Sequence, residues 1–143
     1  YFTYIKIIKK SMNLKILKIA SYTNDNRVLE NPSHILKNKN PICGDEIEIR
    51  VIIKNNIVKD IAYQCKSCVY CQASVSLLSR KIKNQKIDKI KKFILLSENI
   101  FENTKTSLEN HWKDFKELFD KKNVSRKECI LLPFKTLKKI VSS

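Results

Sequence analysis

The sequence predicts an α+β fold, because a strand pattern gives way to a helical pattern at a group of cysteines. Residues 46–53 (EIEIRVII) alternate charged with β-branched side chains, and residues 57–63 (IVKDIAY) follow a turn at 54–56, which predicts a β-hairpin. Residues 71–82 (CQASVSLLSRKI) then place small and apolar side chains at helical spacing, and little breaks the helical character until about Ser97. We therefore expect an antiparallel hairpin followed by helical structure.

The region before the hairpin is expected to hold one short helix and a loop. Residues 13–20 place apolar side chains at helical spacing, and Asn13 can cap them, which predicts a short amphipathic helix packed on the core. Residues 21–40 are polar and contain Asn31-Pro32, which indicates a loop with little regular structure.

Two further helices are expected toward the C-terminus. Residues 107–121 predict a surface helix that Ser107 can cap and that buries an apolar stripe. Pro133 suits the first turn of a last helix over residues 134–141 (FKTLKKIV). The stripe consists of Leu108, Trp112, Phe115 and Phe119.

A length of 143 residues is the usual size of one domain. We expect an N-terminal extension with its short helix at residues 1–20 and a single domain at residues 21–143. The first residue is Tyr1 and the single methionine is Met12. We therefore also expect that natural translation starts at Met12 and that residues 1–11 are extra.

The chain is strongly basic, with 29 Lys and Arg against 14 Asp and Glu and a formal net charge of +15. Such an excess can attract phosphates or acidic partners. The positive residues are nearly all lysines scattered among Ile and Asn, with no arginine-rich or aromatic-interleaved stripe that would grip bases or phosphates. The pattern therefore argues against a nucleic-acid partner.

The apolar segments are too short for a membrane protein. Lysines interrupt every hydrophobic stretch before it reaches the about 18 residues that cross a bilayer. The opening YFTYIKIIKK lacks the uninterrupted apolar region and the cleavage site of a signal peptide, so we expect a cytoplasmic protein. In the reducing cytosol its five cysteines should remain thiols, which favours metal binding or sulfur chemistry.

Gly44 is the single glycine of the chain, although average usage of about 7% would give roughly ten in this length. It stands between Cys43 and Asp45. Glycine is retained where φ must be positive or where the backbone approaches a bound group. The segment NPICGD therefore indicates a tight turn, which either points a thiolate and a carboxylate at one place or only leads into the hairpin.

Cys65, Cys68 and Cys71 have the spacing C-x2-C-x2-C, which matches the first three ligands of a bacterial ferredoxin motif. Val75 and Ser76 stand where that motif requires Cys and Pro, so a ferredoxin is disfavoured. The same cysteines could belong to a zinc site, which needs four ligands from separate segments.

Cys43 and Cys129 could complete such a zinc site. The two histidines, His34 and His111, lie outside the cysteine motifs and are expected on the surface or on a helix face. A zinc module that binds nucleic acid through its lysine-rich surface is thus an alternative from another functional class.

Three ordered segments resemble the signature motifs of NifU/IscU iron–sulfur cluster assembly proteins. They are residues 40–45 (NPICGD), 68–78 (CVYCQASVSLL) and 126–137 (RKECILLPFKTL). The family motifs are approximately N-P-x-C-G-D, then G-C-x-x-x-x-A-S-x-S, then a final Cys followed by a Leu-rich helix. The resemblance extends from about residue 40 to the C-terminus.

Two features resemble the SufU-like branch of this family. The motif match aligns Cys68 and Cys129 with the second and third family cysteines, and the long interval between them contains the predicted helix at 107–121. Glu128 stands where IscU scaffolds carry His, and Arg126 stands where SufU-like proteins have Arg.

Three residues depart from the family motifs. Cys65 and Ser67 replace glycines before the second cysteine, and Cys71 replaces a residue that is usually small and polar. The resemblance leaves open whether Cys65 or Cys71 exchanges with Cys68 as a ligand.

The resemblance implies a compact α+β fold, with a small antiparallel sheet of about three strands packed with helices and a site where the three cysteine loops meet. It implies that the site binds zinc through Cys43, Asp45, Cys68 and Cys129, since a cation would neutralise the crowded thiolates. Cys43 would accept sulfur, Cys129 could also relay it, and Arg126 would steer an anionic persulfide.

The resemblance also implies the partners. A pyridoxal-phosphate-dependent cysteine desulfurase would deliver the persulfide, and iron–sulfur apoproteins or a scaffold would receive the sulfur. The chain would then be at most a sulfurtransferase-type accessory protein. The alternative within the family is a scaffold that assembles a [2Fe–2S] cluster on the same residues in place of zinc.

Overall fold

The computed structural model describes residues 14–103 and 106–142. The expectation that residues 1–11 are extra and the helix cap predicted at Asn13 lie outside the described residues. Within the described ranges, no helix combines the length and the apolar character that crossing a membrane requires.

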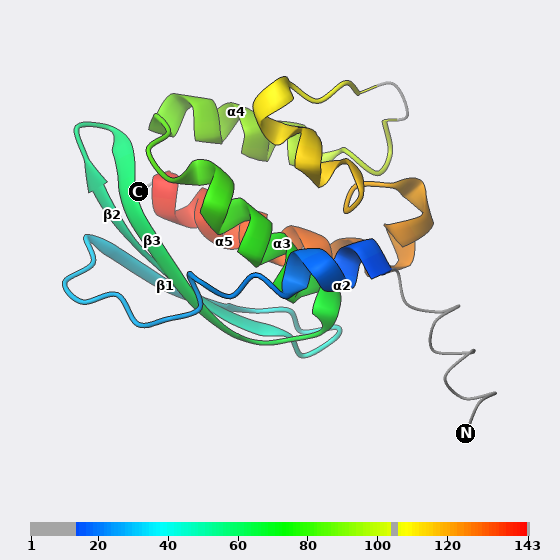
Figure 1. The fold of residues 1–143 in the computed structure, drawn as a ribbon, viewed down its shortest axis with the longest axis horizontal. Coiled ribbons are helices and arrows are strands. Elements are labelled where there is room, and N and C mark those ends of the chain that lie inside the picture. The colour runs from blue at the N-terminus through cyan, green and yellow to red at the C-terminus, as the bar shows by residue number, and fades with distance from the viewer. Residues whose placement is uncertain (1–13, 104–105, 143) are drawn as a thin grey trace.

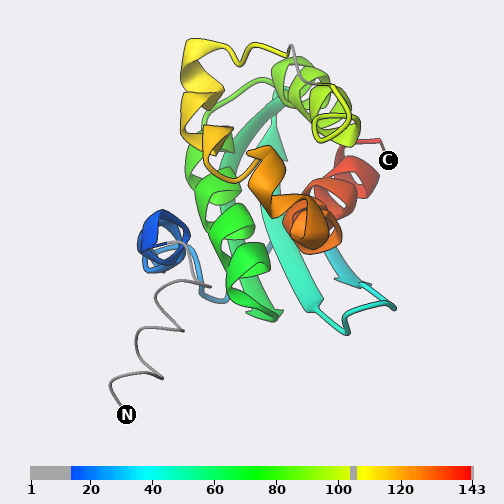
Figure 2. The same cartoon turned by 90° about the vertical axis from the view of Figure 1, so that its right-hand side faces the viewer.

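Three antiparallel strands form one sheet in the order β1-β2-β3, and the helices pack against one face of it (Figure 1). The strands are β1 (His34–Lys39), β2 (Glu46–Lys54) and β3 (Ile57–Lys66). Two long helices, α3 (Val69–Ile82) and α5 (Lys127–Val141), lie side by side on the sheet, as the end-on view in Figure 2 shows. The predicted α+β fold with a small antiparallel sheet is confirmed.

The hairpin of β2 and β3 agrees with the sequence prediction. Asn55 and Asn56 form its turn with φ angles of 54° and 60°, a left-handed conformation that Asn tolerates and that a two-residue hairpin turn favours. Alternate residues of β2 are fully buried against the helices. These residues are Ile47, Ile49 and Val51.

The edge strand β1 was missed, since little regular structure was predicted before the hairpin and this is wrong for residues 34–39. The strand pairs with β2 from His34 opposite Val51 to Lys39 opposite Glu46. None of its side chains is fully buried. Because backbone pairing rather than side-chain burial holds this strand, no run of alternating apolar residues marks it in the sequence.

The helical region after the cysteines is split into α3 and α4 (Ile87–Glu98). The expectation of helical character up to about Ser97 is therefore wrong at residues 83–86. Asn84 adopts a left-handed φ of 63°, and its N–H donates to the carbonyl of Val58 at 2.7 Å. A left-handed residue of this kind ends a helix, and here it lies in the turn that connects α3 to α4.

The segment predicted as one surface helix at 107–121 forms a 3-10 helix instead, η1 (Asn110–Lys116), and a second one, η2 (Lys121–Arg126), follows it. Glu109 rather than Ser107 occupies the N-cap position of η1. The segment is rich in aromatic residues, Asn, Asp and His, whose helix propensities are modest. Packing of the aromatic rings therefore determines the local conformation.

The predicted aromatic stripe is nevertheless buried, and it joins α4, η1 and α5 in one cluster. The ring of Phe93 stacks on Trp112 with the centroids 4.1 Å apart, and Phe115 lies 5.6 Å from Phe134. Aromatic pairs at these separations stabilise the fold beyond the effect of burying their apolar area. The cluster consists of Phe93, Trp112, Phe115, Phe119 and Phe134.

Helix α5 begins at Lys127, so the prediction that Pro133 stands in its first turn is wrong. Residues 129–134 are all buried, and packing against the sheet and α3 extends the helix toward its N-terminus. Pro133 lies inside the helix and cannot donate to the carbonyl of Cys129 four residues earlier. Burial of the whole helical face therefore outweighs the lost hydrogen bond.

The predicted N-terminal helix is present as α2 (Leu14–Ala20), which packs against α3. Ile16 is 1% exposed and belongs to the same core as the sheet and the other helices. The hydroxyl of Ser76 in α3 donates to the carbonyl of Tyr22 at 2.6 Å, which fixes the chain after α2. The division into residues 1–20 and 21–143 stays a prediction.

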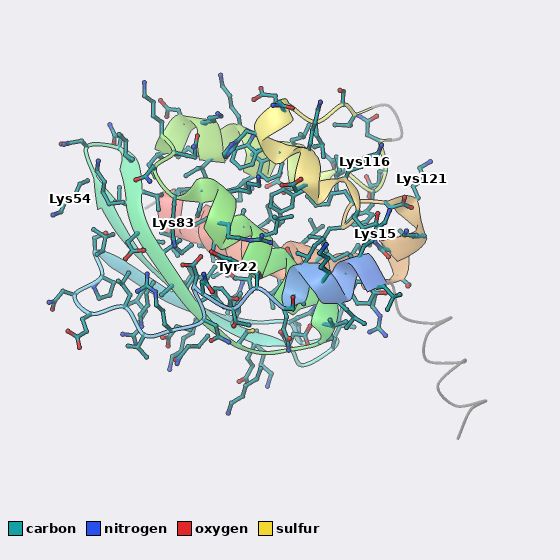
Figure 3. All side chains as sticks on the ribbon, viewed as in Figure 1. Lys15, Tyr22, Lys54, Lys83, Lys116 and Lys121 are labelled. Atoms are coloured by element: carbon teal, nitrogen blue, oxygen red, sulfur yellow. The ribbon has the colours of Figure 1, made fainter. Side chains whose placement is uncertain are left out.

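The lysines lie on many sides of the molecule. Figure 3 labels Lys54 at the hairpin end and Lys116 and Lys121 at the opposite end. Some of the cationic side chains interact with neighbours. Arg80 lies over the ring of Tyr22, and Lys81 and Lys122 form ion pairs with acidic side chains. The positive charge is therefore distributed rather than concentrated in one stripe.

Candidate metal and sulfur site

Cys43 lies in a tight turn that closes the gap between β1 and β2. The N–H of Gly44 donates to the carbonyl of Asn40 at 2.8 Å, and the N–H of Asn40 donates to the carbonyl of Asp45 at 2.8 Å. Gly44 has a φ of 77°, and a Cβ placed on it would meet no atom within 4 Å. Glycine is therefore required here for its backbone conformation, and the predicted tight turn is confirmed.

Asp45 connects this turn to the beginning of α3. Its side chain is buried, with the residue 6% exposed. The backbone N–H of Cys68, the N-cap residue of α3, donates to Oδ1 of Asp45 at 3.1 Å, and the Cys68 thiol donates to Oδ2 at 3.4 Å. A buried carboxylate bonded in this way holds Cys68 and the turn in a fixed relation.

Cys129 reaches the same place from the first turn of α5. Its Sγ lies 3.7 Å from Sγ of Cys43. Ligand atoms of Cys43, Asp45 and Cys129 all lie within 4.8 Å of one another. Two segments that are far apart in the sequence, the turn before β2 and the start of α5, therefore converge on one point. The hydrogen bonds of Asp45 place the N-terminal end of α3 beside it.

The structure brings together three of the four predicted ligands and places the fourth beside them. Cys68 contacts Asp45, but the close group contains Cys43, Asp45 and Cys129. Arg126 is exposed, and its guanidinium lies 5.6 Å from the ring centroid of Tyr70. The roles predicted for these residues stay predictions.

The histidines lie elsewhere among the described residues. The Nδ1 atom of His34 lies 3.0 Å from the hydroxyl of Ser33, and Nε2 of His111 lies 2.6 Å from the carbonyl of Lys81. Neither imidazole belongs to the group of potential ligands found in the described part of the chain.

The electrostatics of the site favour a bound cation. Burial raises the pKa of the Cys129 thiol, and the neighbouring Cys68, Cys43 and Asp45 raise it further. Negative groups gathered in this way cannot all ionise without a compensating positive charge. A divalent metal supplies such a charge, and thiolate sulfur with carboxylate oxygen is a ligand set that suits zinc and also iron.

The other two cysteines flank Cys68 in the sequence, Cys65 on β3 and Cys71 on α3. Cys71 is fully buried and Cys65 is half-buried. Burial raises the pKa of both thiols, which opposes ionisation of either side chain without a metal.

Two residues at the mouth of the site were not singled out from the sequence. Ile42, directly before Cys43, is 82% exposed, and Tyr70 lies beneath Arg126. An apolar residue inside a polar turn was the signal for Ile42, whereas nothing in the sequence marked Tyr70. A groove of about 860 Å³ opens beside Ile42 and runs along α5 over Leu131. The surface near the site therefore combines the apolar side chain of Ile42 with the positive charge of Arg126.

The model of the NifU-like N-terminal domain matches residues 13–116, which includes Cys43 and Cys68 but ends before Cys129. Among curated proteins, the chain is 31% identical over 124 residues to the iron–sulfur cluster assembly scaffold protein IscU of Thermotoga maritima, with 84% of this chain and 87% of that protein covered. It is also 30% identical over 63 residues to the zinc-dependent sulfurtransferase SufU of Bacillus subtilis, covering 44% of this chain and 43% of that protein.

Two solved structures have the same fold. The N-terminal part of a NifU-like protein from Brucella abortus has a TM-score of 0.83 and 20% identity, with 91% of each chain covered. A candidate iron–sulfur cluster assembly scaffold of the SUF system from Fervidobacterium islandicum has a TM-score of 0.82 and 23% identity, with 90% of this chain and 94% of that chain covered. The match to the domain model over most of the chain, together with the Thermotoga relative, shows that this chain belongs to the NifU/IscU family.

Proposed function

We propose that this protein works in iron–sulfur cluster assembly and accepts sulfur from a cysteine desulfurase at Cys43. The observation that carries the proposal is the exposed thiol of Cys43, which lies 3.7 Å from the thiol of Cys129 and in one group with Asp45. Sulfur transfer needs an accessible attacking thiol, and a second thiol within reach allows exchange. The names of the Thermotoga and Bacillus relatives support the same pathway.

A zinc ion would be held by Cys43, Asp45, Cys68 and Cys129. When bound, it would keep the thiols deprotonated and thus nucleophilic. Asp45 accepts both the backbone N–H and the thiol of Cys68, so it positions that side chain at the edge of the close group.

Sulfur would enter as a persulfide on a protein partner. Cys43 is the exposed thiol of the close group, whereas Cys129 is 4% exposed, so Cys43 makes the first attack. Its thiolate attacks the outer sulfur of the donor persulfide, a new S–S bond forms on Cys43, and the donor leaves as a thiolate. Cys129 can take the same sulfur by a second exchange over the short distance between the two Sγ atoms.

The surroundings of Cys43 suit an approaching protein partner. Ile42 offers exposed apolar surface directly before Cys43 in the chain, and the exposed Arg126, three residues before Cys129, offers positive charge. Arg126 would attract the anionic persulfide as the donor enters. A pyridoxal-phosphate-dependent cysteine desulfurase supplies sulfur of this kind, and iron–sulfur apoproteins or a scaffold would receive it.

Assembly of a [2Fe–2S] cluster on the same residues is the second candidate function. The breadth of the match to the Thermotoga scaffold favours it. Glu128 favours sulfur transfer instead, because its carboxylate pairs with Lys135 at 2.8 Å and no imidazole precedes Cys129 as a further cluster ligand.

The proposal predicts that the protein stimulates a cysteine desulfurase. The experiment measures alanine formation from cysteine by a bacterial desulfurase, with and without the purified chain, and follows the mass of the chain. We expect faster turnover and an added sulfur atom on the chain. Unchanged turnover together with an unmodified chain mass would contradict sulfur transfer.

A further inference from the structure

Cluster assembly poses a redox problem that accepting a persulfide does not solve. The transferable sulfur of a persulfide is at the oxidation state of elemental sulfur, whereas the bridging atoms of an iron–sulfur cluster are sulfide. Each sulfur atom must therefore gain two electrons. Two neighbouring thiols that become one disulfide release two electrons, so a second thiol beside the persulfide can complete the reduction.

The beginning of α3 offers such a pair of thiols. Cys68 is the N-cap residue of this helix, and Cys71 is the third residue of its first turn. The side chains of an N-cap residue and of the third helical residue are neighbours, which is why they bond to each other's backbone in a capping box. The spacing C-x-x-C at a helix N-terminus therefore places two thiols within reach of one disulfide bond.

The environments of the two thiols differ in the way such a reaction needs. Cys68 is half-buried and faces the site, where its thiol donates to Asp45. Cys71 is 0% exposed and belongs to the buried core. A thiol enclosed in this way is protected from external oxidants and donors, so its reaction with Cys68 is favoured over reactions with molecules in solution.

Cys68 also connects to the thiols that receive sulfur. The thiol of Cys129 lies 3.7 Å from that of Cys43, and the thiols of Cys129 and Cys68 both neighbour the carboxylate of Asp45. Sulfur accepted at Cys43 can thus move through Cys129 to Cys68 by successive thiol exchanges. Cys71 then lies at the inner end of a series of thiols that begins at the protein surface.

We propose that Cys68 and Cys71 act as a dithiol pair that reduces transferred sulfur and releases it as sulfide. The inference rests on the proposed sulfur transfer. The thiol of Cys71 attacks the inner sulfur of a persulfide on Cys68, the Cys68–Cys71 disulfide forms, and the bond to the outer sulfur breaks. The outer sulfur leaves with the electron pair as HS⁻, and the proton of Cys71 goes to water or to the departing sulfide. A small-molecule dithiol restores the pair.

Cys65 serves as the matched control for this assignment. It is also a half-buried thiol near Ser67, but it lies on β3, where it is paired with Ile47, and it is not part of the helical turn. The backbone pairing of β3 fixes its position independently of α3. Replacing Cys65 removes a thiol of similar surroundings without breaking the Cys68–Cys71 pair.

The experiment loads the reduced full-length chain with cysteine persulfide under anaerobic conditions and then removes the donor. Released sulfide is measured with a bimane probe, and disulfides are mapped by mass spectrometry. The wild type and Cys65→Ala should release sulfide and acquire a Cys68–Cys71 link. Cys71→Ala should retain the added sulfur and release sulfide at least about tenfold more slowly, because the intramolecular thiol is missing.

The outcomes separate this inference from the function on which it rests. Retention of the added sulfur by the wild type, without a disulfide, would overturn the dithiol role while sulfur acceptance stands. A chain that never gains sulfur would overturn both. A link from Cys68 to Cys65, or sulfide release from Cys71→Ala at the wild-type rate, would also overturn the assignment. Mapping the disulfide in the wild type gives this answer even if Cys71→Ala folds poorly.

Discussion

Replacing Cys43 by serine is expected to reduce sulfur acceptance from a cysteine desulfurase by more than about 100-fold, comparable to the loss when an enzyme is deprived of its nucleophile. Cys43 is the exposed thiol of the close group, and a serine hydroxyl is not ionised near neutral pH and does not form a persulfide. The variant keeps the turn, because Gly44 and Asp45 make its backbone hydrogen bonds. The measurement is the mass of the chain after a single desulfurase turnover.

Cys65→Ser is the control for this loss, since Cys65 lies outside the group formed by Cys43, Asp45 and Cys129. It should acquire sulfur at the wild-type rate. Equal loss in both variants, or full acceptance by Cys43→Ser, would show that Cys43 is not the entry point for sulfur.

Phe115→Ala is expected to lower the free energy of unfolding by about 3–5 kcal/mol, the usual cost of truncating a buried phenylalanine. Phe115 is 0% exposed, and its ring lies 4.9 Å from Phe93 and 5.6 Å from Phe134. Its removal leaves a cavity where η1, α4 and α5 meet. Since α5 carries Cys129, the site should also lose rigidity.

Urea denaturation followed by tryptophan fluorescence measures the effect, with Leu95→Ala as the control. Leu95 is 59% exposed on α4, so its truncation should change the unfolding free energy by no more than about 0.5 kcal/mol. A loss below about 1 kcal/mol in Phe115→Ala would contradict the central role of the aromatic cluster.

The elements that the sequence predicted are those whose local signals agree with their packing. The hairpin combines alternating buried residues with the two asparagines of its turn, and both signals act over a few residues. The edge strand β1 depends on pairing with β2, which a local pattern does not encode. Asn84 interrupts the helical pattern through a bond to Val58, a contact between distant residues.

The site was predictable in its residue types and less so in its arrangement. Gly44 marked the turn through its rarity, and Cys43 and Asp45 flank it. The relation between Asp45 and Cys68 depends on how β2 and α3 pack, because the carboxylate accepts the N-terminal N–H of a helix far along the chain. The start of α5 was also not predictable from local sequence. Proline is disfavoured inside a helix, but burial outweighs this cost at Pro133, so α5 begins at Lys127 and Cys129 lies in its first turn.

The central claim is that Cys43, Cys68, Cys129 and Asp45 form one metal site. Metal content tests this claim most directly. The protein is purified without added metal, and elemental mass spectrometry is applied to the wild type, to Asp45→Ala and to Asp88→Ala, whose carboxylate is exposed on α4. The account predicts about one zinc per chain in the wild type and in Asp88→Ala and much less in Asp45→Ala. Iron with matching sulfide would favour the scaffold alternative. Freshly reduced wild-type protein without any metal would contradict the shared site.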